Sequence, residues 1–274
     1  MFLITGANGQ LGTALHALLQ DKAEYIDRED LDLTNEEAVK TFFSNKHYDF
    51  VINCAAYTAV DKAEEDVDTA YKINALAPRY LGKYAKNVIH ISTDYVFDGM
   101  AYTPYTEDIT PTPLSVYGQT KREGEINVIE QADTAIVIRT SWLYSPHGTN
   151  FVKTIRKLAS ERESLNVIFD QIGTPTNAYD LAQAIISIIP QIAPKEKGIY
   201  HFSNEGVCSW YDFATEIVLQ SNLTCQINPI ESKDYKTLAK RPFYSVLNKG
   251  KIKQRFNITI PHWKEGLKQC LKLF

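Results

Sequence analysis

Thr93, Tyr117 and Lys121 carry groups that could together assist the reduction of a carbonyl group. Tyr117 and Lys121 lie four residues apart in "VYGQTK", so on a helix they would share one face. The Tyr117 phenol could donate a proton, the Lys121 ammonium group would lower the pKa of that phenol, and the Thr93 hydroxyl could hydrogen-bond the carbonyl oxygen. A tyrosine and a lysine at this spacing are also common on helix surfaces, so the pattern needs support from other features.

One such feature lies at the start of the chain, where Gly6, Gly9 and Gly12 follow the apolar run "FLIT". Glycines between a strand and a helix let the backbone turn tightly and approach a pyrophosphate, which binds at the helix N-terminus. The spacing GxxGxxG differs from the dinucleotide fingerprint GxGxxG, and a glycine turn can also serve packing alone. The position between a predicted strand and a predicted helix favours a dinucleotide site that includes Gly6 and Gly9.

The kind of dinucleotide is left open by the stretch "YIDRED". Asp27 stands where an acidic residue would bind the adenine-ribose hydroxyls of NAD, whereas Arg28 could bind the 2′-phosphate of NADP. Both are also ordinary solvated charges for the end of a strand. These two residues leave the choice between NADPH and NADH unresolved.

Short apolar runs that alternate with amphipathic ones predict the elements that hold these residues. Val- and Ile-rich strands buried on both faces are expected at 2–5, 24–26, 50–55, 87–92, 135–140 and 166–169. Helices are expected at 10–20, 35–46, 67–86 and 115–130. This alternation predicts an α/β protein with a Rossmann-type, doubly wound parallel sheet. Thr93 and Asp94 then lie at the carboxyl end of a strand, where such sheets bind ligands.

A change of pattern near residue 141 predicts a second, smaller α+β lobe. We assign residues 1–146 and 164–194 to the dinucleotide-binding domain, and residues 147–163 and 195–274 to the substrate-binding lobe. The substrate cleft is expected between the two, at the carboxyl ends of the strands.

Composition narrows the classes of partner. The net charge of −4 argues against nucleic acid or an anionic membrane, and the longest apolar run, "AIISII", is too short to span a bilayer. The four cysteines, at positions 54, 208, 225 and 270, show no CxxC spacing, so we expect reduced thiols and no metal. A cytoplasmic protein is expected.

Several stretches resemble the extended short-chain dehydrogenase/reductases, and among them the dTDP-4-dehydrorhamnose reductases: "GANGQLG", "NCAAYTAVDKAE", "STDYVFDG", "YGQTK", "RTSWLY", "DQIGTPT" and "RPFYSVLN". The resemblance implies NADPH- or NADH-dependent reduction of the 4-keto group of dTDP-4-dehydro-L-rhamnose to dTDP-L-rhamnose. It implies catalytic roles for Thr93, Tyr117 and Lys121, and substrate contacts for Thr93, Asp94 and Trp142, the last of which would otherwise be read as a core aromatic residue. It implies cofactor contacts for Gly9, Gln10, Leu11, Asp32, Leu33, Ala55, Ala56 and Tyr57. Tyr117 and Lys121 are also expected to contact the cofactor, where Lys121 can hydrogen-bond the nicotinamide ribose.

The chain departs from the family pattern at two places. Some family members dimerise around a magnesium ion that is bound through a glutamate, and the matching residue here is Ala14. A homodimer is therefore only a possible state of this protein, and no metal is assigned. The stretch "RPFYSVLN" keeps Arg241 and Pro242 but not the glycine and asparagine that usually follow them. Arg241 could still bind the substrate diphosphate, or it could be a surface charge.

Two alternatives to this reductase stay open at this point. One is a non-catalytic, NADP-binding regulatory subunit similar to that of methionine adenosyltransferase. The other is a reductase or epimerase of another nucleotide sugar. Tyr95, in the place of a glutamate, argues against a dehydratase.

Overall fold

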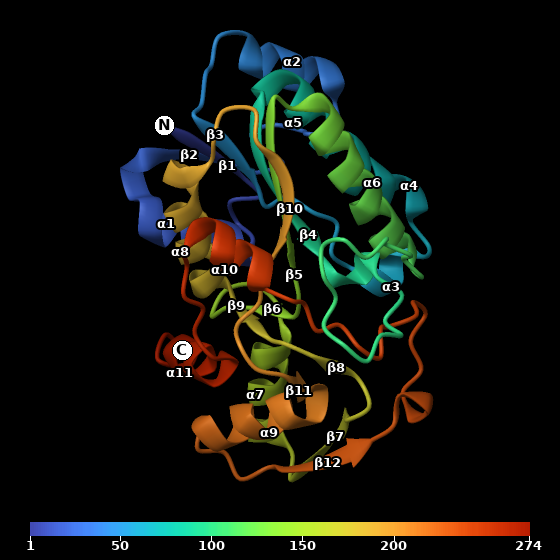
Figure 1. Ribbon diagram of the computed structural model, residues 1–274. Helices are drawn as coiled ribbons and strands as arrows, with labels where there is room; N and C mark the ends of the chain where they lie inside the picture. The colour runs from blue at the N-terminus through green and yellow to red at the C-terminus, as the bar shows by residue number, and fades with distance from the viewer.

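The computed structural model describes residues 1–274, and its centre is a six-stranded parallel sheet. The strand order is β10-β5-β4-β3-β1-β2, as predicted for a Rossmann-type, doubly wound sheet (Figure 1). The strands are β1 (Phe2–Thr5), β2 (Ala23–Ile26), β3 (Phe50–Asn53), β4 (Asn87–Thr93), β5 (Thr134–Thr140) and β10 (Lys197–His201).

Strand register explains why the sheet is apolar on both faces. Ile4 pairs with Ile52, Ile52 with Ile89, and Ile89 with Ile136, so one row of buried isoleucines crosses four strands. The residues one position earlier on each strand form a row on the opposite face, because successive side chains alternate between the faces: Leu3, Val51, Val88 and Ala135.

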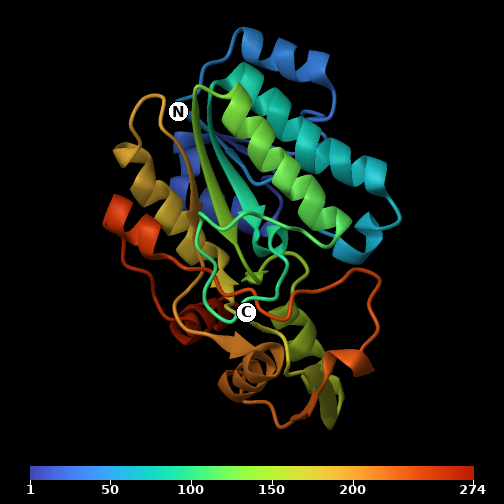
Figure 2. The ribbon, with the colours of Figure 1, turned by 45° about the vertical axis from the view of Figure 1, so that its right-hand side comes forward.

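Helices cover both faces of this sheet (Figures 1 and 2). The isoleucine face packs against α1 (Gln10–Leu19), α8 (Ala178–Ile188) and α10 (Gly250–Phe256). The other face packs against α2 (Glu36–Ser44), α5 (Ala77–Ala85) and α6 (Val116–Gln131). Between β3 and α5 the chain forms α3 (Val60–Ala63), α4 (Val67–Tyr71) and one π-helical turn, η2 (Lys72–Leu76).

A smaller lobe lies below the carboxyl ends of the strands in Figure 1. It contains α7 (Phe151–Glu161), α9 (Trp210–Gln220), α11 (Trp263–Leu271) and a parallel pair formed by β7 (Ser164–Ile168) and β12 (Gln226–Ile230). Its own core includes the aromatic residues Tyr144, Phe213 and Trp263. Two short pairs lie between the two parts: β6 (Leu143–Tyr144) with β9 (Thr176–Asn177), and β8 (Ile172–Gly173) with β11 (Cys208–Ser209).

Two strands lie outside the domain boundaries that the sequence predicts. The strand expected at 166–169 pairs with β12 in the smaller lobe, because Leu165 and Val167 pack in that core. Strand β10, from the segment assigned to the smaller lobe, pairs with β5 and completes the main sheet, and its Tyr200 packs in the core there. The two assignments are wrong for these strands; the rest of the division stays a prediction.

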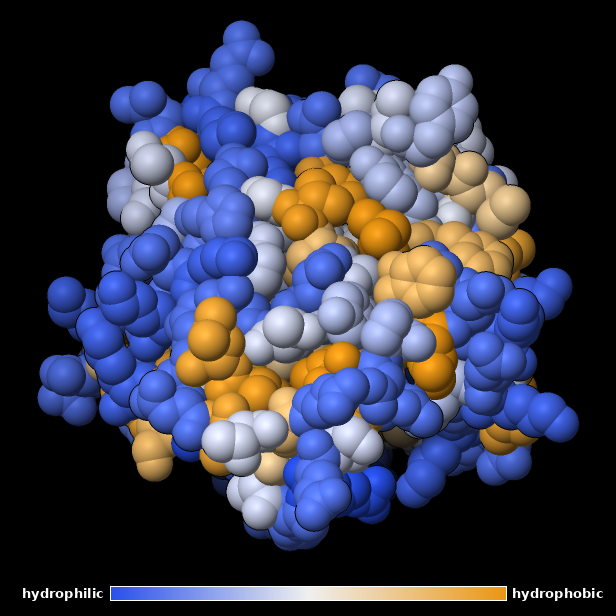
Figure 3. Space-filling view, turned by 90° about the horizontal axis from the view of Figure 1, so that it is seen from below, coloured by the Kyte–Doolittle hydropathy of each residue, from blue (hydrophilic) through white to orange (hydrophobic).

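The surface of the smaller lobe, seen from below, is mostly hydrophilic (Figure 3). Apolar side chains gather there in several patches that hydrophilic residues separate. No helix of the protein has both the length and the apolar composition that crossing a membrane requires.

Candidate active site

A cavity of about 480 Å³ opens at the carboxyl ends of β1, β2 and β3. This is the edge at which parallel sheets bind nucleotides. Most of the predicted cofactor residues line it: Gly6, Gly9, Asp27, Arg28, Asp32, Leu33, Ala55 and Ala56.

The backbone of the glycine turn packs too closely against its neighbours to admit side chains. Gly6 has φ +66°, and a Cβ there would lie 2.7 Å from the backbone nitrogen of Ala55. A Cβ on Gly12 would lie 2.4 Å from the Gly6 carbonyl oxygen. Gly9 is the N-cap of α1 and offers no side chain to its first-turn amides. A glycine turn, a helix N-terminus and an adjoining cavity are the parts that a dinucleotide pyrophosphate needs, so these residues fit the cofactor.

Five other predicted cofactor residues do not line the cavity: Gln10, Leu11 and Tyr57, and also Tyr117 and Lys121 of α6. Leu11 packs in the main core. The Gln10 carboxamide accepts a hydrogen bond from Asn150 at 2.9 Å, which connects α1 to the loop after β6. The Tyr57 backbone is held by Asn74, whose Oδ1 accepts from the Tyr57 amide at 2.9 Å. Asn74 belongs to the π-helical turn η2, and π-helical turns are frequent at functional sites.

Asp27 and Arg28 have different surroundings. Asp27 Oδ2 accepts a hydrogen bond from the Asn8 amide at 2.9 Å, so the carboxylate is attached to the glycine turn. Arg28 lies near enough to Asp32 to contribute to the lowered pKa of that carboxyl, although hydrogen bonds from Thr34 are the larger cause. The guanidinium group is exposed at the rim of the cavity.

The three predicted catalytic side chains come from β4 and α6. Thr93 is the last residue of β4, and Tyr117 and Lys121 lie in the first turns of α6. Ser115 caps this helix by accepting from the Gly118 amide at 3.1 Å. Tyr117 is 9 % exposed and Lys121 is 2 % exposed. The Thr93 hydroxyl lies near enough to the Tyr117 phenol to affect its pKa, although it donates its own hydrogen bond to Asp94 Oδ1.

The pKa of Tyr117 differs from the expectation that Lys121 would lower it. Burial raises the pKa of the phenol, and hydrogen bonding to Thr93 only partly opposes this. Lys121 does not lower this pKa in the structure, and its Nζ donates to the Ile91 carbonyl oxygen at 2.5 Å and not to the phenol. Burial also lowers the pKa of Lys121 to about 8. Tyr117 is therefore a neutral phenol at neutral pH, which is the proton-donating form.

Asp94 lies directly beside this pair and is buried. Its Oδ1 accepts from the Thr93 hydroxyl at 3.0 Å, while Oδ2 has no hydrogen-bond partner. Burial raises the pKa of this carboxyl to about 6. Tyr95, the next residue, packs edge-on against Tyr117 with ring centroids 5.5 Å apart.

The other two predicted substrate residues lie where the lobes meet. Trp142 has φ +49° and stacks on Trp210, the first residue of α9, with ring centroids 3.5 Å apart. Arg241 Nη2 forms an ion pair with Asp61 of α3 at 2.8 Å, and Arg241 Nε is buried without a partner. Arg241 is therefore paired with a carboxylate and is not a free surface charge.

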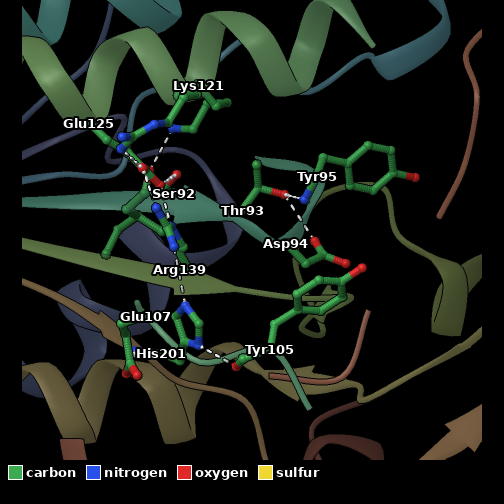
Figure 4. A network of polar contacts seen from close by, with 12 residues as sticks. Ser92, Thr93, Asp94, Tyr95, Tyr105, Glu107, Lys121, Glu125, Arg139 and His201 are labelled. Carbon is green, nitrogen blue, oxygen red and sulfur yellow. Dashed lines mark hydrogen bonds and ion pairs between the residues drawn. The ribbon is translucent and has the colours of Figure 1, made fainter. Parts of the chain in front are cut away.

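Several residues at the site have no signal in the sequence pattern. Trp210, the first residue of α9, is not a predicted site residue. Glu125 and Arg139 are buried together beneath Lys121, as Figure 4 shows. For Arg139, the one sequence signal is a charged residue inside an apolar strand. Such pairs depend on contacts between distant segments.

The parallel sheet, the glycine turn with its cavity, and the Thr93–Tyr117 pair beside Lys121 define a short-chain dehydrogenase/reductase. The chain belongs to the family described as the RmlD substrate binding domain, whose model matches residues 1–274.

The chain is similar over nearly its whole length to several known reductases. A dTDP-4-dehydrorhamnose reductase from Aggregatibacter actinomycetemcomitans is 43 % identical, covering 97 % of this chain and 96 % of the relative. A dTDP-4-dehydrorhamnose reductase from Bacillus anthracis, solved in complex with NADP, is 38 % identical, with a TM-score of 0.95 and coverage of 100 % and 99 %. A probable dTDP-4,6-dihydroxy-2-methyloxan-3-one 4-ketoreductase from Streptomyces antibioticus is 38 % identical, covering 98 % and 94 %.

Proposed function

We propose that this protein is an NADPH-dependent reductase that converts the 4-keto group of dTDP-4-dehydro-L-rhamnose to the hydroxyl group of dTDP-L-rhamnose. The observation that carries the proposal is the neutral Tyr117 phenol beside the Thr93 hydroxyl, at the end of β4. This pair lies on the same sheet edge as the cavity that fits a dinucleotide.

The reaction adds a hydride to the carbonyl carbon and a proton to the carbonyl oxygen. NADPH, when bound, supplies the hydride. The Tyr117 phenol gives its proton to the oxygen as the C=O π bond breaks, and the Thr93 hydroxyl hydrogen-bonds the same oxygen as negative charge develops there. Lys121, four residues along α6, would hydrogen-bond the nicotinamide ribose of the bound cofactor.

The cofactor cavity supports NADPH over NADH. Asp27 is already hydrogen-bonded to the Asn8 amide, whereas Arg28 at the rim carries a planar cation suited to a phosphate. The pyrophosphate would lie against Gly6 and Gly9 at the N-terminus of α1. The relative from Bacillus anthracis was solved with NADP.

The substrate would occupy the junction of the lobes. The stacked pair Trp142 and Trp210 offers an aromatic wall for the sugar or the base. Arg241 would bind the diphosphate, and its partner Asp61 orients the guanidinium group. Asp94 Oδ2, which is buried and unpaired, would accept a hydrogen bond from a sugar hydroxyl.

The alternatives have less support. A regulatory subunit would not need the complete Thr93, Tyr117 and Lys121 set in this arrangement. One observation supports the alternative that the substrate is another dTDP-4-keto sugar: the similarity to the relative from Streptomyces antibioticus. The homodimer, the absence of a metal and the cytoplasmic location stay predictions.

The test is the consumption of NADPH by the purified protein, followed by its absorbance, with enzymatically prepared 4-keto sugar nucleotides. We expect oxidation of NADPH with dTDP-4-dehydro-L-rhamnose and formation of dTDP-L-rhamnose by chromatography. A faster reaction with dTDP-4-keto-6-deoxy-D-glucose would reassign the substrate. No oxidation with any 4-keto nucleotide would contradict the proposal.

A further inference from the structure

Glu125, a carboxylate on α6, is completely buried beneath the proposed site (Figure 4). Arg139 donates to both of its oxygens, Nε to Oε1 and Nη2 to Oε2, each at 2.8 Å. The Ser92 hydroxyl donates to Oε1 at 2.6 Å, and Arg122 Nη1 donates to Oε2 at 2.9 Å. Burial alone would raise the pKa of Glu125, but these contacts lower it below its ordinary value, so the carboxylate stays ionised at neutral pH.

The partners of Glu125 belong to the segments that carry the proposed catalytic and substrate residues. Ser92 immediately precedes Thr93 on β4. Arg139 pairs with Ser92 in the sheet, and Trp142 follows three residues later. Glu125 itself lies one turn after Lys121 on α6. One carboxylate therefore connects the ends of β4 and β5 to the helix.

The far end of this network is closed by His201 on β10. Burial lowers the pKa of His201 to about 3, so its ring is neutral. The geometry then assigns the tautomer: Nδ1 donates to the Tyr105 carbonyl oxygen at 3.1 Å, and Nε2 accepts from Arg139 Nη1 at 3.5 Å. Because Glu125 is ionised and His201 is uncharged at neutral pH, the negative charge of Glu125 is constant there.

Lys121 is the ionisable group that this charge affects most directly. Burial lowers the pKa of Lys121, and the Glu125 carboxylate opposes the decrease. The other groups that face Lys121 are neutral at physiological pH: Tyr117 on the same helix, the Cys54 thiol after β3, whose pKa burial raises to about 12, and the His90 ring on β4. Glu125 is therefore the anion that keeps Lys121 protonated.

We propose that Glu125 is a positioning residue for the reductase reaction: it holds α6 against the ends of β4 and β5 and keeps the Lys121 ammonium group charged. This inference depends on the proposed function only for the consequence in catalysis. The contacts and the charge balance belong to the folded chain itself.

The first experiment titrates Lys121 by NMR in protein labelled at lysine Cε, with the signal assigned by its loss in Lys121→Arg. Glu125→Gln keeps the shape of the side chain but removes its charge. We expect the pKa of Lys121 to fall by about one unit or more, the effect of losing a close opposite charge. Glu123→Gln, a half-buried residue of the same helix, is the matched control and should leave the titration unchanged.

The second experiment measures kcat/KM against pH with NADPH and the 4-keto substrate. In Glu125→Gln the alkaline limb of the profile should move to lower pH by the same amount as the Lys121 titration, a loss of about tenfold per unit on that limb. Glu125→Asp keeps the charge, so its alkaline limb should stay near the wild-type position. A uniform loss at every pH with an unchanged Lys121 titration would overturn the inference.

Glu125→Gln leaves Arg139 as an unpaired buried charge and so carries a risk of misfolding. The double variant Glu125→Gln/Arg139→Met removes the buried cation together with the anion, so the pKa of Lys121 should fall less than in Glu125→Gln, because the two removed charges have opposite effects on it. A larger fall in the double variant than in Glu125→Gln would overturn the inference. An inactive wild-type protein with the expected Lys121 titration would refute the proposed function alone.

Discussion

The cofactor side and the substrate side of the cleft are built in different ways. The cofactor cavity is lined by residues between Thr5 and Ala77, from consecutive strand ends and the loops that follow them. The proposed substrate side takes Asp94, Trp142, Trp210 and Arg241 from four separate segments. One side relies mainly on glycines, small residues and a helix terminus, and the other on large side chains held by tertiary contacts.

This difference teaches how each side can vary. Backbone amides and a glycine turn bind a pyrophosphate whatever the neighbouring side chains are, which suits a cofactor shared by many enzymes. Aromatic stacking and an arginine fixed by Asp61 depend on the alignment of the two lobes. We therefore expect substitutions on one side to leave binding on the other side largely intact.

The largest expected effect comes from Tyr117→Phe, which separates the two sides most clearly. Removing the proton donor should lower kcat by about 10²- to 10⁴-fold. The dissociation constant of NADPH, measured by fluorescence titration, should stay close to the wild-type value, because the phenol does not line the cavity. A kcat within a factor of two of wild type would remove Tyr117 from the role of acid.

A smaller effect, on stability, is expected from Asp94→Asn on the substrate side. The folded-state pKa of Asp94 is raised to about 6 from an ordinary value near 4, so the folded protein loses stability as the pH rises through this range. The amide carries no charge, and the free energy of unfolding at pH 7 should increase by about 1–3 kcal/mol.

Urea denaturation at pH 4.5 and pH 7 checks this sign. The gain from Asp94→Asn should be present at pH 7 and mostly absent at pH 4.5, while kcat falls. Asp98→Asn is the matched control: the Tyr105 hydroxyl lowers the pKa of Asp98, so its loss should destabilise the protein at pH 7. If Asp94→Asn changed the free energy of unfolding equally at both pH values, burial would not be raising the pKa of the Asp94 carboxyl.

The smallest effect should come from Arg28→Ala at the rim of the cofactor cavity. Loss of a charge-assisted contact to the 2′-phosphate should raise the KM of NADPH about tenfold and leave that of NADH almost unchanged. Lys40→Ala, exposed on α2 outside the cavity, serves as the control. A parallel rise for both cofactors would assign Arg28 to folding or to general electrostatics instead.

The sequence was sufficient for most of the main sheet. Strands such as 50–55 and 135–140 are continuous apolar runs separated by amphipathic helices, and that local pattern predicts a parallel sheet. The local pattern failed to place β10, because a five-residue strand separated from β5 by a long stretch of chain gives no indication of which sheet it joins. Pairing between β10 and β5 is set by tertiary contacts.

Prediction of the site divides in the same way. The glycine turn and the Tyr117–Lys121 spacing are local signals, and the structure brings the Tyr117 phenol close to Thr93. The effect of Lys121 on the pKa of Tyr117 was predicted from spacing alone and was wrong in this structure, since burial and the Ile91 carbonyl oxygen decide the outcome. Trp210 could not be found from the sequence, because its role depends on the packing of α9 against the loop after β5.

The late position of β10 in the chain affects how the protein can be made. During synthesis on the ribosome, β5 emerges more than fifty residues before its neighbour, so the main sheet has an open edge until the last quarter of the chain appears. Exposed strand edges promote association with other chains. A gene fragment that stops before residue 197 would therefore give a protein prone to aggregation, and the nucleotide-binding half is not suited to expression on its own.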